Sequence, residues 1–362
     1  MAYGNYPDLK KVKRILVIKM RHHGDVLLTS PLFSLLKKRV PEAQIDAYIY
    51  ADGLPMLEGH PAIRKFFLYD RAWKKLGFLK KLLKEWALLR SMRREKYDLI
   101  LNLTEGDRGA IVAKFCGAIY RVGYDPEKKG FFGKRKIYTH LIKNCRTPRH
   151  TVEKQLDAAR RIGIFPDPEE RELFFHVPEA ARERARELVK EEEYILIHPV
   201  SRWRFKCPPV EKMGELVRKL RERGYTVVIT SGPDQAEKEM VEAILVDQEG
   251  VINLSGKTTL KELGALIERA HTVICVDSVP LHIASALKTP LVALFGPTSE
   301  IEWGPWQHPR AQVIAKKWSC RPCGLDGCGG SKKSDCLSQL SIDEILESEV
   351  LAEVGRPSLL TL

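Results

Sequence analysis

Short apolar runs alternate with amphipathic stretches along most of the chain, and this alternation constrains the fold more than any other feature. In the first half, strands are expected at residues 15–18, 45–50, 66–69 and 99–103, and helices at 26–39 and 78–94. In the second half, strands are expected at 194–197, 227–230, 251–254, 272–276 and 291–295, and helices at 209–223, 234–245, 260–270 and 281–287. Strands that alternate with helices favour right-handed crossovers and parallel sheets. The pattern therefore predicts an α/β protein with two Rossmann-like, doubly wound domains that face each other across a cleft.

The chain is too long for one comfortable hydrophobic core. It has 362 residues, and a domain commonly takes about 150. The most proline-rich and turn-prone stretch is Phe-Pro-Asp-Pro-Glu at 165–169, which is where a linker is expected. We therefore predict an N-terminal domain at 1–170, a C-terminal domain at 171–340, and a last helix and tail at 341–362.

The chain is basic, with 60 Lys and Arg against 47 Asp and Glu and a net charge of +13. This excess predicts attraction to anionic partners such as nucleic acid, an anionic membrane surface or a phosphorylated glycolipid. Residues 1–8 lack the basic start and apolar core of a secretory signal, and no apolar run reaches the roughly 18 residues of a spanning helix. A cytoplasmic protein with at most peripheral membrane contact is expected.

A carboxylate follows the first expected strand, in His22-His23-Gly24-Asp25. The loop between a strand and the next helix is where doubly wound sheets place their ligands. Asp25 can cap the helix, or it can act as a general base that removes a proton from an acceptor hydroxyl. His22 and His23 are predicted to contact the acceptor or to pack in the loop.

Three loops between a strand and the following helix carry candidate residues in the second half. Ser201 and Lys206 follow the strand at 194–197, and an ammonium there can neutralise a diphosphate leaving group. Asp277 and Ser278 begin a helix whose free N–H groups suit a phosphate, although an ordinary helix cap is the alternative. Asp234 can bind a ribose hydroxyl or cap its helix.

Half of the eight cysteines fall in one glycine-rich loop, at Cys320, Cys323, Cys328 and Cys336. In a reducing compartment this grouping indicates a structural zinc site rather than disulfides, although only the first pair has standard ligand spacing. A catalytic metal is not expected there. The other cysteines are expected to be small buried side chains: Cys116, Cys145, Cys207 and Cys275.

Residues 74–96 form a basic, amphipathic stretch that contains Trp86. Such a helix can lie on an anionic membrane surface, or it can pack an apolar face on the domain core and leave its lysines in water. The two interpretations can hold for different portions of the helix.

Several motifs are absent from the sequence. There is no Asp-x-Asp, the carboxylate pair with which many metal-dependent glycosyltransferases hold a nucleotide diphosphate. The phosphate-binding loop Gly-x-x-x-x-Gly-Lys-Ser/Thr and a Gly-x-Gly-x-x-Gly fingerprint after the first strand are also missing, which argues against an NTPase and a dehydrogenase.

Three segments resemble the lipopolysaccharide heptosyltransferases of glycosyltransferase family 9. They are Ile-Leu-Val-Ile-Lys-Met-Arg-His-His-Gly-Asp-Val-Leu-Leu-Thr-Ser-Pro at 15–31, Ala-Leu-Ile-Glu-Arg-Ala at 265–270, and the segment from Asp-Ser-Val-Pro-Leu-His to Phe-Gly-Pro-Thr at 277–298. Residues 19–25, 97–104, 205–207 and 276–282 look most like the branch that adds the third heptose of the inner core.

The resemblance implies a GT-B fold, with an acceptor-binding N-terminal domain at 1–170 and a nucleotide-sugar-binding C-terminal domain at 171–340. It also implies an inverting transfer of heptose from ADP-heptose that requires no cofactor. It implies that Asp25 is the catalytic base, that Lys206 and Ser201 flank the diphosphate, that Asp234 meets the ribose and that Thr258 meets the adenine. The residues implied to hold the diphosphate and heptose are Asp277, Ser278, Val279, Pro280 and His282. The implied acceptor is an anionic lipid A-linked core at the cytoplasmic face of the inner membrane.

Other functions remain open on the sequence. A family 9 enzyme can act at another core position or with another nucleotide sugar, and a protein of this fold can bind a nucleotide sugar without turnover. The net charge alone permits a nucleic-acid-binding protein, but no recognised nucleic-acid motif is present, so nucleic acid is not expected as a partner.

Overall fold

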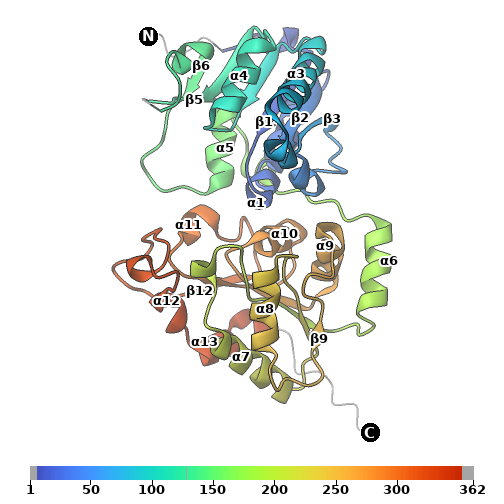
Figure 1. Cartoon of the computed structure of the whole chain (residues 1–362), viewed down its shortest axis with the longest axis vertical. Coiled ribbons are helices and arrows are strands. Elements are labelled where there is room, and N and C mark those ends of the chain that lie inside the picture. The colour runs from blue at the N-terminus through green and yellow to red at the C-terminus, as the bar shows by residue number, and fades with distance from the viewer. Residues whose placement is uncertain (1–5, 128, 353–362) are drawn as a thin grey trace. The chain divides into compact units, whose positions relative to one another are not determined.

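The chain forms two compact units, 1–176 and 177–362, each built on one parallel sheet (Figure 1). The computed structural model describes residues 6–127 and 129–352. In the first unit the strands are β1 Arg14–Lys19, β2 Gln44–Tyr50, β3 Ile63–Tyr69, β4 Leu99–Asn102, β5 Tyr120–Tyr124 and β6 His140–Ile142. Its α-helices are α1 His23–Leu27, α2 Ser30–Arg39, α3 Phe78–Arg94, α4 Asp107–Phe115 and α5 Thr151–Arg160.

The second unit repeats this construction. Its strands are β7 Ile195–His198, β8 Val227–Ile229, β9 Ile252–Asn253, β10 Thr272–Val276, β11 Leu291–Phe295 and β12 Ala311–Ala315. Its longer helices are α6 Glu179–Leu188, α7 Val210–Glu222, α8 Gln235–Ile244, α9 Leu260–Arg269 and α10 Val279–Leu287. Its short helices are α11 Glu300–Trp303, α12 Asp335–Ser338, α13 Ile342–Leu346 and α14 Glu349–Ala352.

Both sheets have the same topology. The strand orders are β3-β2-β1-β4-β5-β6 and β12-β11-β10-β7-β8-β9, which in each unit is the Rossmann order 3-2-1-4-5-6. The central strands are almost wholly apolar and fully buried, as expected when helices cover both faces of a parallel sheet. The predicted α/β class with two doubly wound domains is confirmed.

Two expected helices are broken into shorter ones. The stretch 26–39 is divided into α1 and α2, because Pro31 cannot continue a helix through its amino side and instead occupies the first turn of α2. The last expected helix, 342–354, is α13 and α14 over its described residues, with Glu347 and Ser348 between them. Three strands were missed, β5, β6 and β12, because they lie toward the sheet edges and carry polar or half-buried residues.

The boundary between the two units lies six residues beyond the predicted limit at residue 170. The proline-rich stretch 165–169 is held on the first unit, where Arg39 donates to Glu170 at 2.6 Å and Asp167 caps a 3₁₀ turn, Pro168–Arg171. Along the chain, the first unit ends at His176 and the second begins at Val177. The helices α13 and α14 pack in the hydrophobic core of the second unit, so the described part of the C-terminal segment belongs to that unit.

An ion cluster ties β2, β3 and the end of α3 together in the first unit. Asp46 is fully buried and accepts from Arg64 Nε at 2.9 Å, from Arg64 Nη2 at 2.6 Å and from the Tyr97 hydroxyl at 2.6 Å. The same guanidinium donates to Glu95 at 2.7 Å, and Arg64 and Lys65 hold the pKa of Glu95 down at about 2.

Replacing Arg64 by methionine is expected to lower the free energy of unfolding by about 3–5 kcal/mol, because the Asp46 carboxylate would stay buried without its cation. Denaturant unfolding measures the loss. In the double variant with Asp46→Asn most of the loss should be recovered. Equal destabilisation of the single and double variants would contradict this explanation.

Candidate functional site

The candidate residues follow the strands between which the strand order of each sheet reverses. In a doubly wound sheet, ligands bind outside the carboxyl ends of the strands where the strand order reverses. This point lies between β1 and β4 in the first unit and between β7 and β10 in the second. Asp25 follows β1, whereas Lys206 follows β7 and Asp277 follows β10. The topology therefore places the predicted residues at the ligand-binding edge of each unit.

In the first unit, Asp25 pairs with a buried lysine. Lys19, the last residue of β1, places Nζ at 3.6 Å from Asp25 Oδ1, and their side chains are only 8% and 18% exposed. Burial lowers the pKa of the Lys19 ammonium, and the nearby Asp25 carboxylate partly opposes this effect. The predicted alternative that Asp25 caps its helix does not describe this arrangement. Residue 22 occupies the N-cap position of α1, and Asp25 lies inside the first turn.

The backbone around Asp25 is fixed by neighbours from β4 and α5. The Met20 N–H donates to Thr104 Oγ1 at 2.8 Å, and Gln155 Nε2 donates to the Asp25 carbonyl at 3.3 Å. His22, at the N-cap, is exposed, and His23 is half-buried at the start of α1. Both remain predicted acceptor contacts. These bonds hold the backbone that carries the Asp25 carboxylate.

A polar hollow adjoins this loop at the carboxyl ends of β4 and β5. It has a volume of about 100 Å³, and its lining includes Thr104, Glu105, Asp125, Lys134 and Asn144. Thr104 and Glu105 also contact the residues that follow β1, at Met20 and Arg21. Carboxylates, amides and ammonium groups of this kind suit sugar hydroxyls. No local sequence pattern predicts this hollow, because its residues come from several separate loops.

In the second unit, Lys206 and Asp277 form a short buried ion pair. Lys206 Nζ lies 2.7 Å from Asp277 Oδ2, and the two side chains are 18% and 5% exposed. The sequence separates them by 71 residues, and the adjacency of β7 and β10 brings them together. An ammonium has three N–H donors, so Lys206 keeps donors for a second partner.

The pair lies at the start of α10, whose first backbone groups are available to a ligand. Ser278 occupies the N-cap position in extended conformation, and its hydroxyl donates to the Val276 carbonyl at 3.2 Å. Within the described residues, no side chain caps this end of α10. Pro280 in the first turn has no N–H to satisfy, and His282 is buried one turn along. A helix start without a side-chain cap, together with the positive end of the helix dipole, suits a phosphate.

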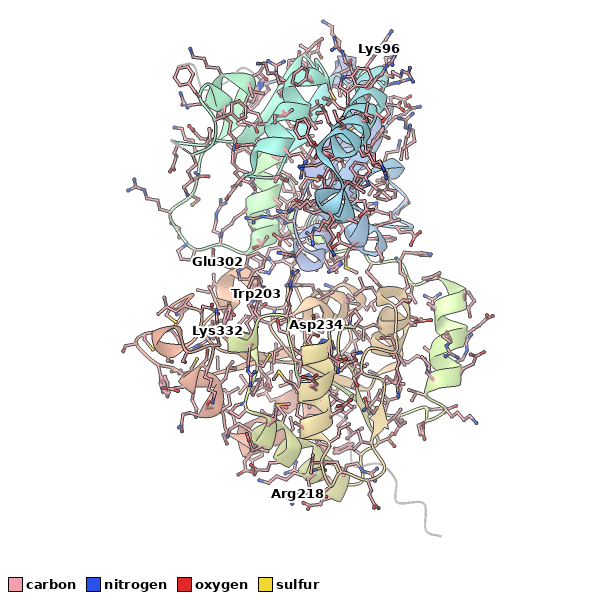
Figure 2. All side chains as sticks on the ribbon, viewed as in Figure 1. Lys96, Trp203, Arg218, Asp234, Glu302 and Lys332 are labelled. Atoms are coloured by element: carbon pink, nitrogen blue, oxygen red, sulfur yellow. The ribbon has the colours of Figure 1, made fainter. Side chains whose placement is uncertain are left out.

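The loop after β7 is closed by its own hydrogen bonds. The Ser201 N–H donates to Cys207 Sγ at 3.2 Å, and Ser201 Oγ accepts from the Trp203 N–H at 3.3 Å. These bonds hold the segment that carries Lys206. Trp203 itself is largely exposed on this loop (Figure 2).

The other predicted donor residues lie after β8 and β9. Asp234 is the N-cap of α8 and accepts from the Ala236 N–H at 3.0 Å, which is its predicted capping role (Figure 2). Thr258 is half-buried after β9, just before α9. Glu237 was missed: it accepts from the Gly232 N–H at 2.9 Å, and burial raises the pKa of its carboxyl. A Cβ at Gly232 would lie 2.7 Å from Glu237 Oε2, so glycine permits this approach.

In each unit, burial of a histidine with a lowered pKa makes stability depend on pH. Burial lowers the pKa of His198, at the end of β7, and of His60 to about 4. Unfolding returns both rings to an ordinary pKa near 6.5, so between pH 6.5 and 4 the unfolded chain binds more protons than the folded one. Stability contributed by the neutral rings is therefore lost as the pH falls through this window.

We expect each histidine to remove up to about 3 kcal/mol from the free energy of unfolding of its unit between pH 6.5 and 4. Denaturant unfolding at a series of pH values tests this. His198→Gln should flatten the pH dependence of the second unit and leave that of the first unchanged. A variant as acid-sensitive as the wild type would contradict the assignment.

The cysteines of the glycine-rich loop differ in exposure, and a structural zinc site there stays a prediction. Cys336 is buried, whereas Cys320, Cys323 and Cys328 are exposed. Across residues 6–127 and 129–352, no group of three or more His, Cys, Asp or Glu side chains is placed to hold a metal ion. The Sγ atom of Cys328 accepts a hydrogen bond from the Asp335 N–H at 3.4 Å. The predicted burial is confirmed for Cys116, Cys207 and Cys275 but is wrong for Cys145, which is exposed.

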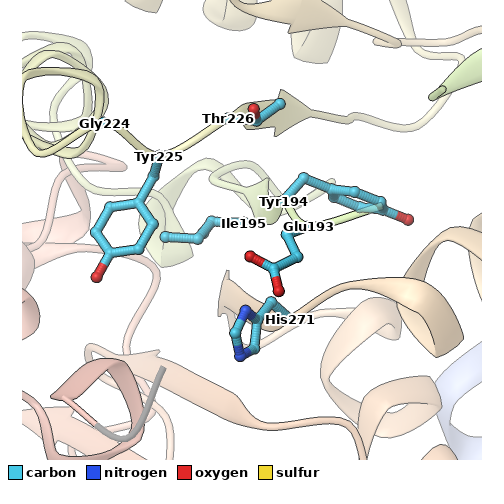
Figure 3. A pocket seen from close by; sticks show the side chains of 7 residues that line it. All are labelled: Glu193, Tyr194, Ile195, Gly224, Tyr225, Thr226 and His271. Carbon is cyan, nitrogen blue, oxygen red and sulfur yellow. The ribbon is translucent and has the colours of Figure 1, made fainter. Parts of the chain in front are cut away.

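The second unit also has a hollow, which lies at the end of its sheet opposite to Lys206 and Asp277. It is lined by residues at the amino ends of β7, β8 and β10, among them Glu193, Tyr225 and His271 (Figure 3). Its volume is about 40 Å³, far below the roughly 300 Å³ or more of a pocket for a nucleotide-sized ligand. It therefore does not compete with the β7/β10 edge as the nucleotide site.

Two Rossmann-like units, each with polar residues at its switch point, form the GT-B fold. The chain belongs to glycosyltransferase family 9 (heptosyltransferase), whose sequence profile matches residues 85–331. It is 37% identical over 302 residues to lipopolysaccharide heptosyltransferase 3 of Escherichia coli, covering 82% of this chain and 87% of that protein. The protein is therefore an enzyme, a glycosyltransferase.

Solved structures share the fold. A family 9 glycosyltransferase from Veillonella parvula superposes with a TM-score of 0.80 at 24% identity, covering 97% of this chain and all of that one. The Escherichia coli ADP-heptose lps heptosyltransferase II superposes with a TM-score of 0.75 at 24% identity, covering 94% and 98% of the two chains. At these identities the likeness establishes the GT-B fold alone.

Proposed function

We propose that the protein transfers L-glycero-D-manno-heptose from ADP-heptose to a heptose of the lipopolysaccharide inner core, as the third heptose. The relative that is 37% identical over 302 residues carries the name lipopolysaccharide heptosyltransferase 3, and a structural neighbour carries ADP-heptose in its name. The observation that carries the proposal is the buried Lys206–Asp277 pair at the uncapped start of α10, because it offers an ammonium and helix N–H groups to a diphosphate.

The proposed reaction is a direct displacement with inversion. The acceptor hydroxyl oxygen forms a bond to the anomeric carbon of the heptose, and the bond from that carbon to the β-phosphate oxygen breaks. The hydroxyl proton passes to Asp25, and the electron pair of the broken bond leaves with ADP. Lys206 and the start of α10 stabilise the charge that develops on the diphosphate.

The remaining donor contacts follow the family resemblance. Ser201, Ser278 and Val279 are proposed to lie along the diphosphate, and Pro280 and His282 to shape the heptose site. Thr258 is proposed to meet the adenine and Asp234 the ribose. The missing Asp-x-Asp motif supports a transfer that needs no metal. The Lys206 ammonium and the start of α10 would then take the place of a metal ion at the diphosphate.

The acceptor is proposed to be an anionic lipid A-linked core at the cytoplasmic face of the inner membrane. The net charge of +13 supports an anionic acceptor. Within the described part of the chain, no helix is long and apolar enough to cross a membrane. The polar hollow beside Thr104 and Glu105 is the proposed place for acceptor sugar hydroxyls.

Incubation of the purified protein with ADP-heptose and defined core oligosaccharides, with products read by mass spectrometry, tests the proposal. One added heptose on the acceptor that lacks only the branch heptose is expected, with and without a chelator. Product from another nucleotide sugar, or on another core position, would assign the protein a different donor or acceptor within the same family. No product with any donor, together with tight binding of ADP-heptose, would indicate a non-catalytic sensor.

A further inference from the structure

The helix α3 is packed on the first unit through one narrow row of residues. Its core-facing row is Glu85, Leu88, Leu89 and Met92, and within the helix only Met92 is fully buried. Glu85 is held on the unit because it accepts from the Tyr69 hydroxyl at 2.7 Å and from Arg108 at 3.1 Å. Figure 1 shows α3 as an outer helix, drawn in front of β1 and β2.

The amino-terminal half of α3 presents an apolar stripe to solvent. Its members are between 50% and 77% exposed: Phe78, Leu79, Leu82, Leu83 and Trp86. Residues four apart lie on one face of a helix, so the pairs 78/82, 79/83 and 82/86 form one continuous surface. An amphipathic helix normally turns such residues toward its own core. Here they point outward, while the core-facing row lies mainly in the second half of the helix.

The charges around the stripe are almost all positive. Residues 74–94 contain eight Lys and Arg residues and one acid, Glu85, which lies on the core side and is paired with Arg108. Arg90 lies over the Trp86 ring at 5.2 Å, and Lys84 lies over the Trp73 ring at 5.4 Å. Apolar and aromatic side chains flanked by ammonium and guanidinium groups are typical of helices that lie in the headgroup region of a bilayer.

We propose that the amino-terminal half of α3 docks on an anionic phospholipid surface, with the stripe in the acyl boundary and the lysines among the headgroups. Charge complementarity selects this occupant, because a second copy of the same helix would bring two strongly positive faces together. This inference deepens the proposed function, since it names the element that would bring the enzyme to a lipid-linked acceptor.

Co-sedimentation of the full chain with lipid vesicles tests the proposal without any transfer reaction. We compare vesicles that contain phosphatidylglycerol with vesicles of phosphatidylcholine alone, at low and at high salt. Binding is expected on the anionic vesicles and should weaken with salt. The variant Leu79→Gln/Leu83→Gln/Trp86→Gln should lower the partition coefficient by at least about tenfold, because three apolar side chains no longer enter the bilayer.

The matched control replaces three apolar residues of similar exposure elsewhere in the chain, as Phe165→Gln/Val246→Gln/Leu325→Gln. It should bind the vesicles as the wild type does. A second variant, Lys80→Gln/Lys84→Gln, should weaken binding and reduce its salt dependence. Trp86 fluorescence should shift to shorter wavelength on anionic vesicles, as judged by difference from Trp86→Phe.

Unchanged vesicle binding by the stripe variant would overturn the proposal. So would a dimer that dissociates in that variant in the absence of lipid, since a second copy would then be the occupant. Transfer to a soluble, lipid-free core oligosaccharide separates the two proposals. A stripe variant that loses vesicle binding but keeps this transfer supports both, whereas vesicle binding by a protein that makes no product would leave only the docking proposal standing.

Discussion

Replacing Asp25 by asparagine is expected to lower kcat for heptose transfer by ~10²–10⁴-fold and to leave ADP binding nearly unchanged. An amide of the same shape cannot accept the proton of the acceptor hydroxyl. Asp25 is mostly buried, and its backbone is held by Gln155, so the substitution should not rearrange the loop. ADP affinity can be measured by titration calorimetry, and transfer by the rate of ADP release.

The Asp25→Asn variant leaves Lys19 buried without its carboxylate, and this stability cost has to be separated from the loss of catalysis. The double variant Lys19→Met/Asp25→Asn removes both charges and provides the control: its melting temperature should recover, and its transfer rate should not. Parallel losses of ADP affinity and of kcat in the single variant would contradict the role of a base. Recovery of transfer in the double variant would contradict it as well.

The sequence predicted the sheets well because their central strands are uniform apolar runs between turn residues. The corner at Asp277 is the clearest example. A buried strand ends in Asp-Ser-Val-Pro, and proline fixes the start of the helix two residues after Ser278. The edge strand β12 was missed because it is only partly buried and follows a long loop. At a sheet edge the burial of one face depends on tertiary packing, which a local pattern does not contain.

The candidate site was predicted as separate corners and not as contacts. The pattern identified Lys206 and Asp277, but their pairing at 2.7 Å follows from the adjacency of β7 and β10. Lys19 was missed for a related reason. It ends a strand-like run, where a lysine usually reaches water, and only the tertiary structure shows its ammonium buried beside Asp25. Glu237 was missed because its position inside α8 gives no local sign of burial.

The two interpretations of residues 74–96 were left open because helical periodicity does not say which face meets the core. In the structure Met92 is buried at one end of α3 and Leu79 is exposed at the other. Both interpretations therefore apply to different parts of the helix: core packing to its second half and, by our proposal, membrane docking to its exposed amino-terminal half.

Replacing Lys206 by methionine is expected to reduce kcat/KM for transfer by ~10²–10³-fold, the magnitude seen when one charge-stabilising donor is removed from a transition state. The departing diphosphate would lose its ammonium and keep only the start of α10. The same change leaves Asp277 buried without a cation and should lower the free energy of unfolding by about 3–5 kcal/mol. Steady-state kinetics and denaturant unfolding measure the two effects separately.

The pairing of Lys206 with Asp277 makes these two effects separable. The double variant Lys206→Met/Asp277→Asn contains no buried unpaired charge, so its stability should approach that of the wild type while transfer stays low. Lys206→Arg keeps the charge but spreads it over a planar guanidinium, so it should keep stability and recover only part of the transfer rate. If stability and transfer instead recovered together in the double variant, Lys206 would serve only to neutralise Asp277. The diphosphate would then be held by the N–H groups of α10 alone.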